Sequence, residues 1–195
     1  TDPLEVVEMS LVTDILLGHS GSPLQGYLES IKESKSISEL SGVDDSSRQL
    51  IFACGLEGVS ANEKKIDMFE KKIFEILHSL IETPPSIETL TASLDRLELD
   101  QSDLGAGNYP LGLQLFGRIL PSTIYRDDPI SLFRLETIIE TLRSRLSDEN
   151  YFPSLIEKIF INNNHWTRIT MRASRDVNPE RMISEKLELV ASGFS

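Results

Sequence analysis

The chain has 195 residues, enough to bury a substantial core as one large domain or two small ones. Its 19 basic residues stand against 31 acidic ones, and the resulting net charge of −12 repels phosphate backbones. No apolar run approaches the roughly 20 residues that span a bilayer. We therefore expect neither nucleic acid nor a membrane as a partner. An acidic surface would favour basic partners, although solubility alone also explains it.

The start of the chain predicts a segment of a longer protein. It reads "TDPLEVVEMS", with no initiator Met and no basic stretch of the kind that opens a signal peptide. Cys54 is the single cysteine, which excludes an intramolecular disulfide and a cysteine-rich zinc cluster. This fits a reducing compartment, the cytoplasm or an organelle matrix.

Two helices are predicted near the N-terminus. Asp2 and Pro3 form a cap and a first turn, and Gly18 suits the end of the first helix. Ser22 before Pro23 has the cap-then-proline order of a second start. The first helix carries a broad apolar stripe made of Val6, Val7, Leu11, Val12, Ile15 and Leu16.

A short β region and two further helices are expected next. "SKSISELSGVDDSS" contains turn formers and a possible short edge strand, and the nearly continuous apolar run "RQLIFACGLEGV" predicts a central strand covered on both faces. From Ala61 an amphipathic helix runs to Pro84 and Pro85, and Ser86 begins another helix. The apolar face of the first of these helices comprises Ile66, Phe69, Ile73, Ile76, Leu77 and Leu80.

The stretch after the turn-rich "QSDLGAGNY" predicts helices separated by prolines. "PLGLQLFGRIL" has Pro110 in its first turn and is expected to end at Pro121. Asp128 before Pro129 caps the next helix, whose face contains Leu132, Leu135, Ile138, Ile139, Leu142 and Leu146.

The C-terminal part predicts a helix, a strand and a helix. "YFPSLIEKIFINNN" is helical, "HWTRITMRAS" alternates as a strand does, and "NPERMISEKLELVASG" begins a last helix at an Asn-Pro cap. The whole pattern predicts an α+β fold that is helix-rich with a small, mainly antiparallel sheet.

Local chemistry gives no catalytic, cofactor-binding or metal-binding residue. Neither H-E-x-x-H nor H-x-x-E-H occurs, and His19, His78 and His165 are too far apart in sequence to form such a pair. Cys54 lies in an apolar run with nothing electropositive beside it, so an inert thiol is expected rather than a nucleophile.

Two further motifs have structural explanations. "GHSGS" (18–22) lacks the spacing and the preceding strand of a nucleophilic serine, so a helix-to-helix turn with Ser22 as the cap explains it better. The acid pairs in "VDDSS" and "RDDP", the latter Asp127 and Asp128, could contribute to a metal site, but turns and caps use Asp in the same way.

Several motifs together resemble one peptidase family. "LVTDILLGHSGSPLQGYLES" followed by "LIFACGLEGVSANEKKIDMFEKKIFEIL" resembles the second half of an α/β-roll domain of the pitrilysin/insulinase metallopeptidases. "GNYPLGLQLFGRILPSTIYRDDPISLFRLE" and "YFPSLIEKIFINNNHWTRITMRASRD" resemble the presequence-protease subfamily. The sequence departs from that pattern at Ser122 and Thr123, where an aromatic residue is common.

This resemblance implies a fragment of a zinc endopeptidase that degrades peptides inside a chamber of four homologous domains. Residues 1–174 would be the second half of a non-catalytic, peptidase-like second domain, and residues 175–195 the start of the helical hinge. The zinc would be bound outside this segment, which alone is expected to be inactive.

The partners of this segment would be the remaining domains of the same chain and peptide substrates. The alternative is an inactive homologue that binds peptides or subunits. A sheet that lacks partner strands would also expose an edge, so self-association of the isolated segment is plausible.

Overall fold

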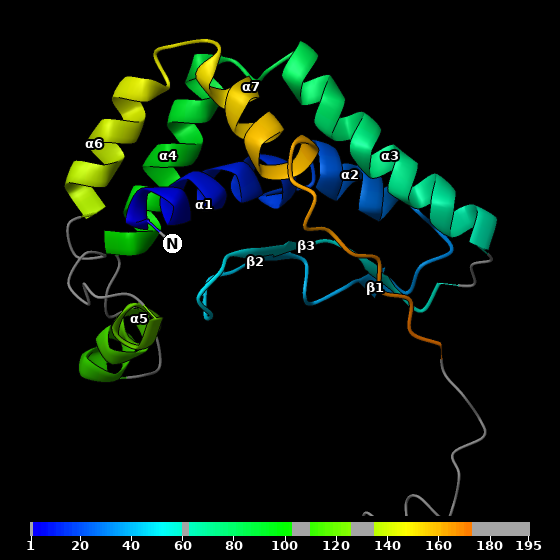
Figure 1. The fold of residues 1–195 in the computed structure, drawn as a ribbon, viewed down its shortest axis with the longest axis horizontal. Coiled ribbons are helices and arrows are strands. Elements are labelled where there is room, and N and C mark those ends of the chain that lie inside the picture. Colours follow the sequence, from blue (N-terminus) through cyan, green and yellow to red (C-terminus); the bar gives the residue numbers. More distant parts are fainter. Residues whose placement is uncertain (1, 60–62, 103–109, 126–134, 173–195) are drawn as a thin grey trace, which may run out of the picture. The chain divides into compact units, whose positions relative to one another are not determined.

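The computed structural model describes residues 2–59, 63–102, 110–125 and 135–172 (Figure 1). One compact unit extends to Asn163, and a second unit begins at Asn164. In the first unit, helices form a layer that covers one face of a short β ribbon (Figure 1). The described part of the chain is therefore α+β and helix-rich, with only antiparallel strand pairs, as its sequence predicts.

Helix α1 (Pro3–Leu17) begins and ends as predicted. The Asp2 carboxylate accepts the Leu4 N–H at 3.0 Å, and the Glu5 carboxylate accepts the Asp2 N–H at 3.4 Å. This reciprocal capping box satisfies amide groups that have no partner inside the helix. Gly18 caps the other end, where its N–H donates to the Asp14 carbonyl at 2.8 Å. The local sequence thus fixes both ends of α1.

Helix α1 is buried on nearly all sides, because α2, α4, α6 and strand β2 all contact it. Helix α2 is Pro23–Ser30, α3 is Glu63–Glu82, α4 is Ile87–Ser102, α6 is Leu135–Arg145 and α7 is Tyr151–Ile156. A π-helical turn, η2 (Glu157–Ile161), continues α7. Within the described residues these bounds confirm the predicted helices, while the π-helical turn had no expected counterpart.

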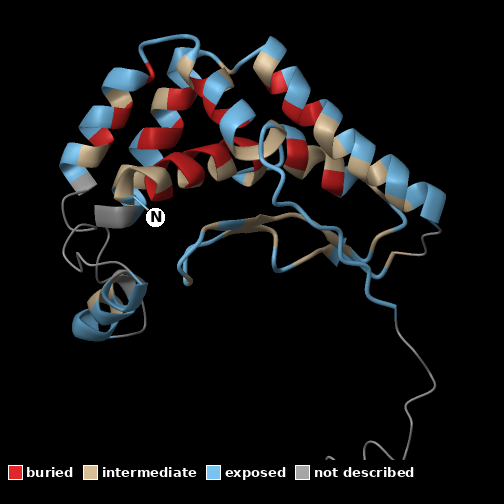
Figure 2. Ribbon diagram, viewed as in Figure 1, coloured by how far each residue is buried: buried red, intermediate tan, exposed pale blue. Residues whose placement is uncertain are grey.

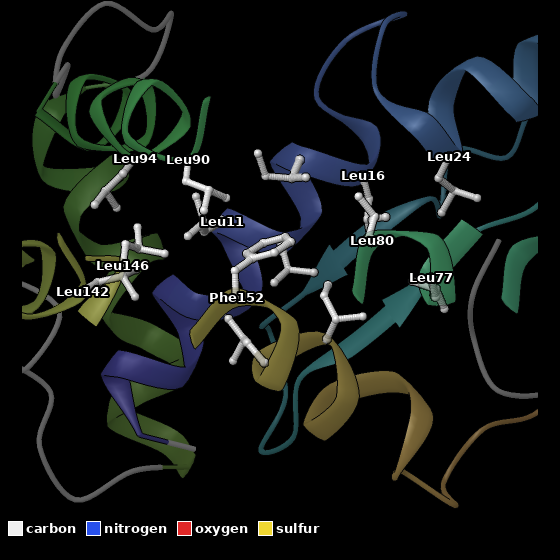
Figure 3. Packing of buried hydrophobic residues seen from close by; sticks show 14 of the residues in the cluster. Leu11, Leu16, Leu24, Leu77, Leu80, Leu90, Leu94, Leu142, Leu146 and Phe152 are labelled. Atoms are coloured by element: carbon white, nitrogen blue, oxygen red, sulfur yellow. The ribbon is translucent and has the colours of Figure 1, made fainter. Parts of the chain in front are cut away.

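The hydrophobic core lies between the helices (Figure 2). Phe152 of α7 is almost fully buried, and Figure 3 shows its ring among leucines that come from different helices. Every helix described above except η2 contributes a buried side chain to this one cluster. Its buried members are Val7, Leu11, Val12, Ile15, Leu16, Leu24, Leu28, Ile76, Leu77, Leu80, Leu90, Leu94, Ile139, Leu142, Leu146, Phe152, Leu155 and Ile156.

The four strands belong to one long hairpin. Strand β1 (Ser36–Ile37) pairs antiparallel with β4 (Leu56–Glu57), and β2 (Gly42–Asp44) pairs with β3 (Ile51–Ala53). Between the two pairs, residues 38–41 of the first strand lie opposite only residues 54–55 of the second. These extra residues form a bulge that divides the hairpin into two short ladders. We call residues 36–57 the β ribbon.

The predicted central strand was wrong in its placement. Its apolar run contains β3 and β4, which each have a single neighbouring strand among the described residues. Phe52, Cys54 and Leu56 pack against the helical core, whereas Ile51 is 53% exposed. One face of the ribbon is therefore covered by helices, and the run lies at an edge.

Two further predictions failed in the described residues. Helix α5 (Leu111–Tyr125) passes through Pro121 instead of ending there. A proline has a helical φ and costs a helix the hydrogen bond to the carbonyl four residues earlier, here that of Gly117, but it does not force an end. Residues 164–172 contain no strand, because an alternating pattern forms one only where a neighbouring strand is available.

Some expectations fall outside the described residues. These are the acid pair Asp127 and Asp128 and the last predicted helix from Pro179. The proposed boundary between residues 174 and 175 also lies there and stays a prediction.

Truncating the core at α1 should destabilise the protein strongly. Leu16 is 0% exposed, so Leu16→Ala removes buried methyl groups and leaves a cavity, at a cost of about 2–5 kcal/mol in the free energy of unfolding. Urea denaturation measures this cost. The matched control is Leu40→Ala in the bulge, where the side chain is 77% exposed and the change should stay within about 0.5 kcal/mol. Equal effects at both positions would contradict the assigned core.

Candidate functional site

The histidines lie on separate elements. His19 belongs to the turn between α1 and α2, where its Nδ1 accepts the Gly21 N–H at 3.1 Å. His78 is exposed on α3, and His165 lies in the second unit. No group of three or more potential metal ligands forms among the described residues.

The "GHSGS" stretch forms the predicted turn between two helices. Ser22 is only 2% exposed, and its hydroxyl donates to the Asp14 carbonyl and accepts the His19 N–H, both at 3.4 Å. It thus ties the turn back to α1. Ser22 occupies the N-cap position of α2 as predicted, but its side chain makes no capping hydrogen bond to that helix. A Cβ at Gly18 would lie 2.4 Å from the Asp14 carbonyl oxygen, so this turn requires glycine. The buried serine is a structural residue.

Cys54 has the environment of an inert thiol. It is partly buried and packs against the helical core. Burial raises the pKa of its thiol from 9.0 to about 11. The thiolate is the reactive form of cysteine, so this shift suppresses reactivity at neutral pH.

The first acid pair closes a turn of the ribbon. Asp44 accepts the Ser46 N–H at 2.9 Å, and hydrogen bonding to Ser46 lowers the pKa of the Asp44 carboxyl group. Asp44 is the last paired residue of β2, and its carboxylate caps the chain as it leaves the strand. Its contacts account for an aspartate at this position.

A polar cluster around the buried Glu8 joins α1 to α7 and to the end of α6. The Tyr151 hydroxyl donates to Oε1 of Glu8, and Glu8 is only 5% exposed. Nη1 of Arg145 lies 3.5 Å from the same carboxylate oxygen and 3.4 Å from the Tyr151 hydroxyl. The guanidinium carbon of Arg145 also lies 5.9 Å from the centre of the Tyr151 ring. We call these three residues the Glu8 cluster.

The electrostatics of the Glu8 cluster favour a structural role. Burial raises the pKa of Tyr151, and the hydrogen bond to Glu8 raises it further, while Arg145 acts in the opposite direction. Hydrogen bonding to Tyr151 is also the main cause that raises the pKa of Arg145. A buried carboxylate is costly unless it is paired and hydrogen-bonded, and both conditions hold for Glu8. The cluster therefore holds helices together, and its carboxylate is already engaged.

Sequence reasoning did not identify this cluster. The signal was an acid, Glu8, placed between apolar residues on a helix that was expected to be buried. Its partner Tyr151 is 143 positions away, so no local pattern connects the two.

Further ion pairs join the same helices near the surface. Arg96 of α4 pairs with Asp14 of α1, and Lys158 of η2 lies 3.4 Å from Glu5 of α1. Partly exposed pairs of this kind contribute only about 0–1 kcal/mol each, so they orient helices more than they stabilise them. A third such contact joins α6 to α4, where Arg143 bonds Asp95 at 2.7 Å and Glu98 at 3.0 Å.

Known proteins match the chain along almost its whole length. No family model matches. Presequence protease 1, chloroplastic/mitochondrial, of Arabidopsis thaliana is 28% identical over 183 residues, which cover 92% of this chain and 16% of the relative. The mitochondrial presequence protease of Mus musculus is 23% identical over 198 residues, covering 100% and 19%. This chain is related to the presequence proteases.

A bacterial relative has a different name. Protein HypA of Clostridium perfringens is 26% identical over 196 residues, which cover the whole chain and 20% of that protein. The chain thus spans about a fifth or less of the length of these relatives. In the part of the chain that the structure describes, no helix has the length and apolarity needed to cross a membrane.

Removing the Tyr151 hydroxyl should reveal the contribution of the Glu8 cluster. Tyr151→Phe leaves a buried carboxylate without its donor, and the free energy of unfolding at pH 7 should fall by about 1–3 kcal/mol. The raised pKa of Tyr151 means that folding favours the protonated hydroxyl. The stability that this provides is complete below the ordinary pKa of 10.0 and is lost as the pH rises through the folded-state value.

Urea denaturation between pH 7 and pH 11 checks this prediction. The difference between wild type and Tyr151→Phe should narrow above pH 10. Tyr27→Phe is the matched control, because the Tyr27 ring stacks on Phe69 and should keep that contact, with a loss below about 0.5 kcal/mol at pH 7. If the Tyr151 variant were as stable as wild type at pH 7, the cluster would have no structural role.

Proposed function

We propose that this chain is a non-catalytic, chamber-forming part of a zinc metalloendopeptidase of the presequence-protease type. The observation that carries the proposal is the match along 92–100% of this chain to about a fifth or less of presequence proteases. A segment of that size is one part of a larger enzyme. Its activity would then depend on the remaining parts.

The zinc of such an enzyme would be bound outside this segment. A structural or catalytic zinc ion needs three or four convergent nitrogen, sulfur or oxygen ligands. Here the described histidines lie on separate elements, and the Cys54 thiol is held in its protonated form by its raised pKa. The described donors do not fit the metal. In the parent protein, a zinc-bound water with a glutamate base would attack the peptide carbonyl.

The segment would contribute a rigid wall. Helices α1, α2, α3, α4, α6 and α7 share one core, and the Glu8 cluster and the ion pairs between helices fix their orientation. The net charge of −12 would make that wall acidic and attractive to basic peptides. The partners of this wall would be the remaining domains of the same polypeptide and the peptide substrate. Relatives carry mitochondrial and chloroplastic names, which supports an organelle matrix, with the cytoplasm as the other candidate.

A peptide- or subunit-binding module without activity is the second candidate. It is favoured by one observation, that the Clostridium perfringens relative is named protein HypA, a name that states no peptidase activity. An H-x-x-E-H motif elsewhere in the parent reading frame supports the peptidase. Its absence would favour the binding module.

Peptide cleavage by the longer protein and by this chain should separate the two candidates. We expect the longer protein to cleave a mixture of unstructured peptides, to lose activity with a zinc chelator and to regain it with added zinc. This chain at the same concentration, with zinc, should show no cleavage above buffer. The matched control is the longer protein with Glu→Gln in its H-x-x-E-H motif, which should fold and stay inactive. Cleavage by this chain alone would overturn the proposal, and a longer protein that only binds peptides would support the second candidate.

A further inference from the structure

The second strand of the β ribbon lies at an open edge. Strands β3 and β4 each have one neighbouring strand among the described residues, and both neighbours lie on the same side, in the first strand of the ribbon. The stretch 51–57 reads "IFACGLE". It contains no proline and no lysine, and Glu57 is its only charge. Natural edge strands usually carry such residues to prevent pairing with another chain, so this edge is unprotected.

The backbone direction of this edge follows from the hydrogen bonds of the ribbon. Gly55 donates its N–H to Oγ of Ser41 at 3.2 Å, and its carbonyl accepts the Ser38 N–H at 2.9 Å. The Glu57 carbonyl also points to the first strand, where it accepts the Lys35 N–H at 2.9 Å. Backbone groups of successive residues alternate in direction along a strand. The N–H and C=O groups of Cys54 and Leu56 therefore point away from the first strand, to the open edge.

The opposite edge of the ribbon is interrupted. The bulge at residues 38–41 breaks the first strand, and Gly42 follows it with a φ of +132°, in a region that L side chains rarely adopt. Bulges of this kind twist an edge away from pairing. Only one of the two edges can accept a strand. Pairing through a single edge gives a closed dimer and not an open filament.

We propose that, when this segment is isolated from the rest of its polypeptide, a second copy pairs antiparallel with residues 51–57, about a two-fold axis at Cys54. Self-association was expected from a sheet that lacks partner strands, and the ribbon now supplies an edge and a register. The symmetry places each Cys54 opposite its counterpart and Phe52 opposite Leu56 of the second copy. Phe52, Cys54 and Leu56 form the row that packs against the helical core, so the two apolar rows would become continuous.

This register also avoids a clash of like charges between two acidic chains. Residues 51 and 57 are equally far from Cys54, so Glu57 lies opposite Ile51 of the second copy. Ile51 is 53% exposed and is the first residue of β3. No acidic residue of one strand then faces an acidic residue of the other. The strand is self-complementary despite the net charge of −12.

Sedimentation equilibrium of this chain, with charges placed at residues 51 and 57, tests the pairing. The wild-type chain should form dimers at micromolar to submillimolar concentrations. Ile51→Glu places two like-charge pairs across the two-fold axis and should raise the dimer dissociation constant about tenfold, whereas Ile51→Lys should lower it. The double variant Ile51→Glu with Glu57→Lys should restore wild-type affinity or exceed it. Within one strand these positions are about 20 Å apart, so the rescue can act only between copies.

Two controls separate pairing from other effects. Met68→Glu adds the same charge at an exposed position of α3 and should leave the dissociation constant within about twofold of wild type. Thermal unfolding of each variant checks the fold, because Ile51 also faces Asp44 within its own ribbon. A wild-type chain that stays monomeric up to about 0.5 mM overturns the proposal. A dimer that the double variant fails to restore also overturns it. Neither result bears on peptide cleavage by the longer protein.

Discussion

The burial of helix α1 is the constraint on which the rest of the first unit depends. Helices α2, α4 and α6 and strand β2 pack along it, Tyr151 of α7 bonds its Glu8, and residues on nearly all its sides are inaccessible to water. A helix that is apolar all round is stable only inside a protein. At about 25 cal/mol per Å² of apolar surface removed from water, such burial is the largest favourable contribution available to this fold. Elements that are far apart in sequence are assembled because α1 must be covered.

The polar contacts of the structure follow from the same constraint. Glu8 enters the interior with α1, and its carboxylate must then be satisfied, which Tyr151 and Arg145 do from α7 and α6. Asp14 is similarly engaged by Arg96 and by the turn that Ser22 holds. Seen alone, each of these groups would suggest chemistry, because buried acids and serines are common in active sites. Here each one has a structural explanation.

The β ribbon depends on the helices more than they depend on it. A two-stranded ribbon is marginally stable by itself, and this one is divided by a bulge into ladders of two and three residues. It is retained because Phe52, Cys54 and Leu56 pack under the helical layer and because Phe52 meets Phe160 of η2, with ring centres 5.0 Å apart. Its covered face thus has helical partners, while its second strand keeps an edge that can accept another strand.

Local sequence predicted the helices well because their signals are local. Asp2 with Glu5, Gly18, and Pro84 with Pro85 each act within one helical turn, and the structure places helix ends at or next to them. The spacing of apolar residues also identified the core faces, since Ile76, Leu77, Leu80 and Leu142 are buried as predicted. Non-local features were not predictable. The apolar run around Phe52 cannot show whether neighbouring strands exist. Tyr151, the partner of Glu8, is 143 residues away in the sequence.

Pro121 shows a different limit. A proline inside a helix removes one hydrogen bond, and whether the helix continues depends on the free energy of the whole element and not on that residue. No catalytic residue was predicted because the expected sequence motifs were missing. The structure adds the bonding partners of Glu8, Asp14 and Ser22. The resemblance to presequence proteases, in contrast, was visible in order and spacing alone, and the sequence matches support it.

Native-state hydrogen exchange of the backbone amides tests the central claim most directly. If the burial of α1 holds the unit together, the amides of Leu11, Val12 and Leu16 should exchange only through global unfolding, with a free energy equal to that from urea denaturation. Amides of the β ribbon, such as that of Asp44, should exchange through smaller openings. If α1 exchanged through openings several kcal/mol below the global value while α3 and α7 stayed protected, the helix would not be the element on which this fold depends.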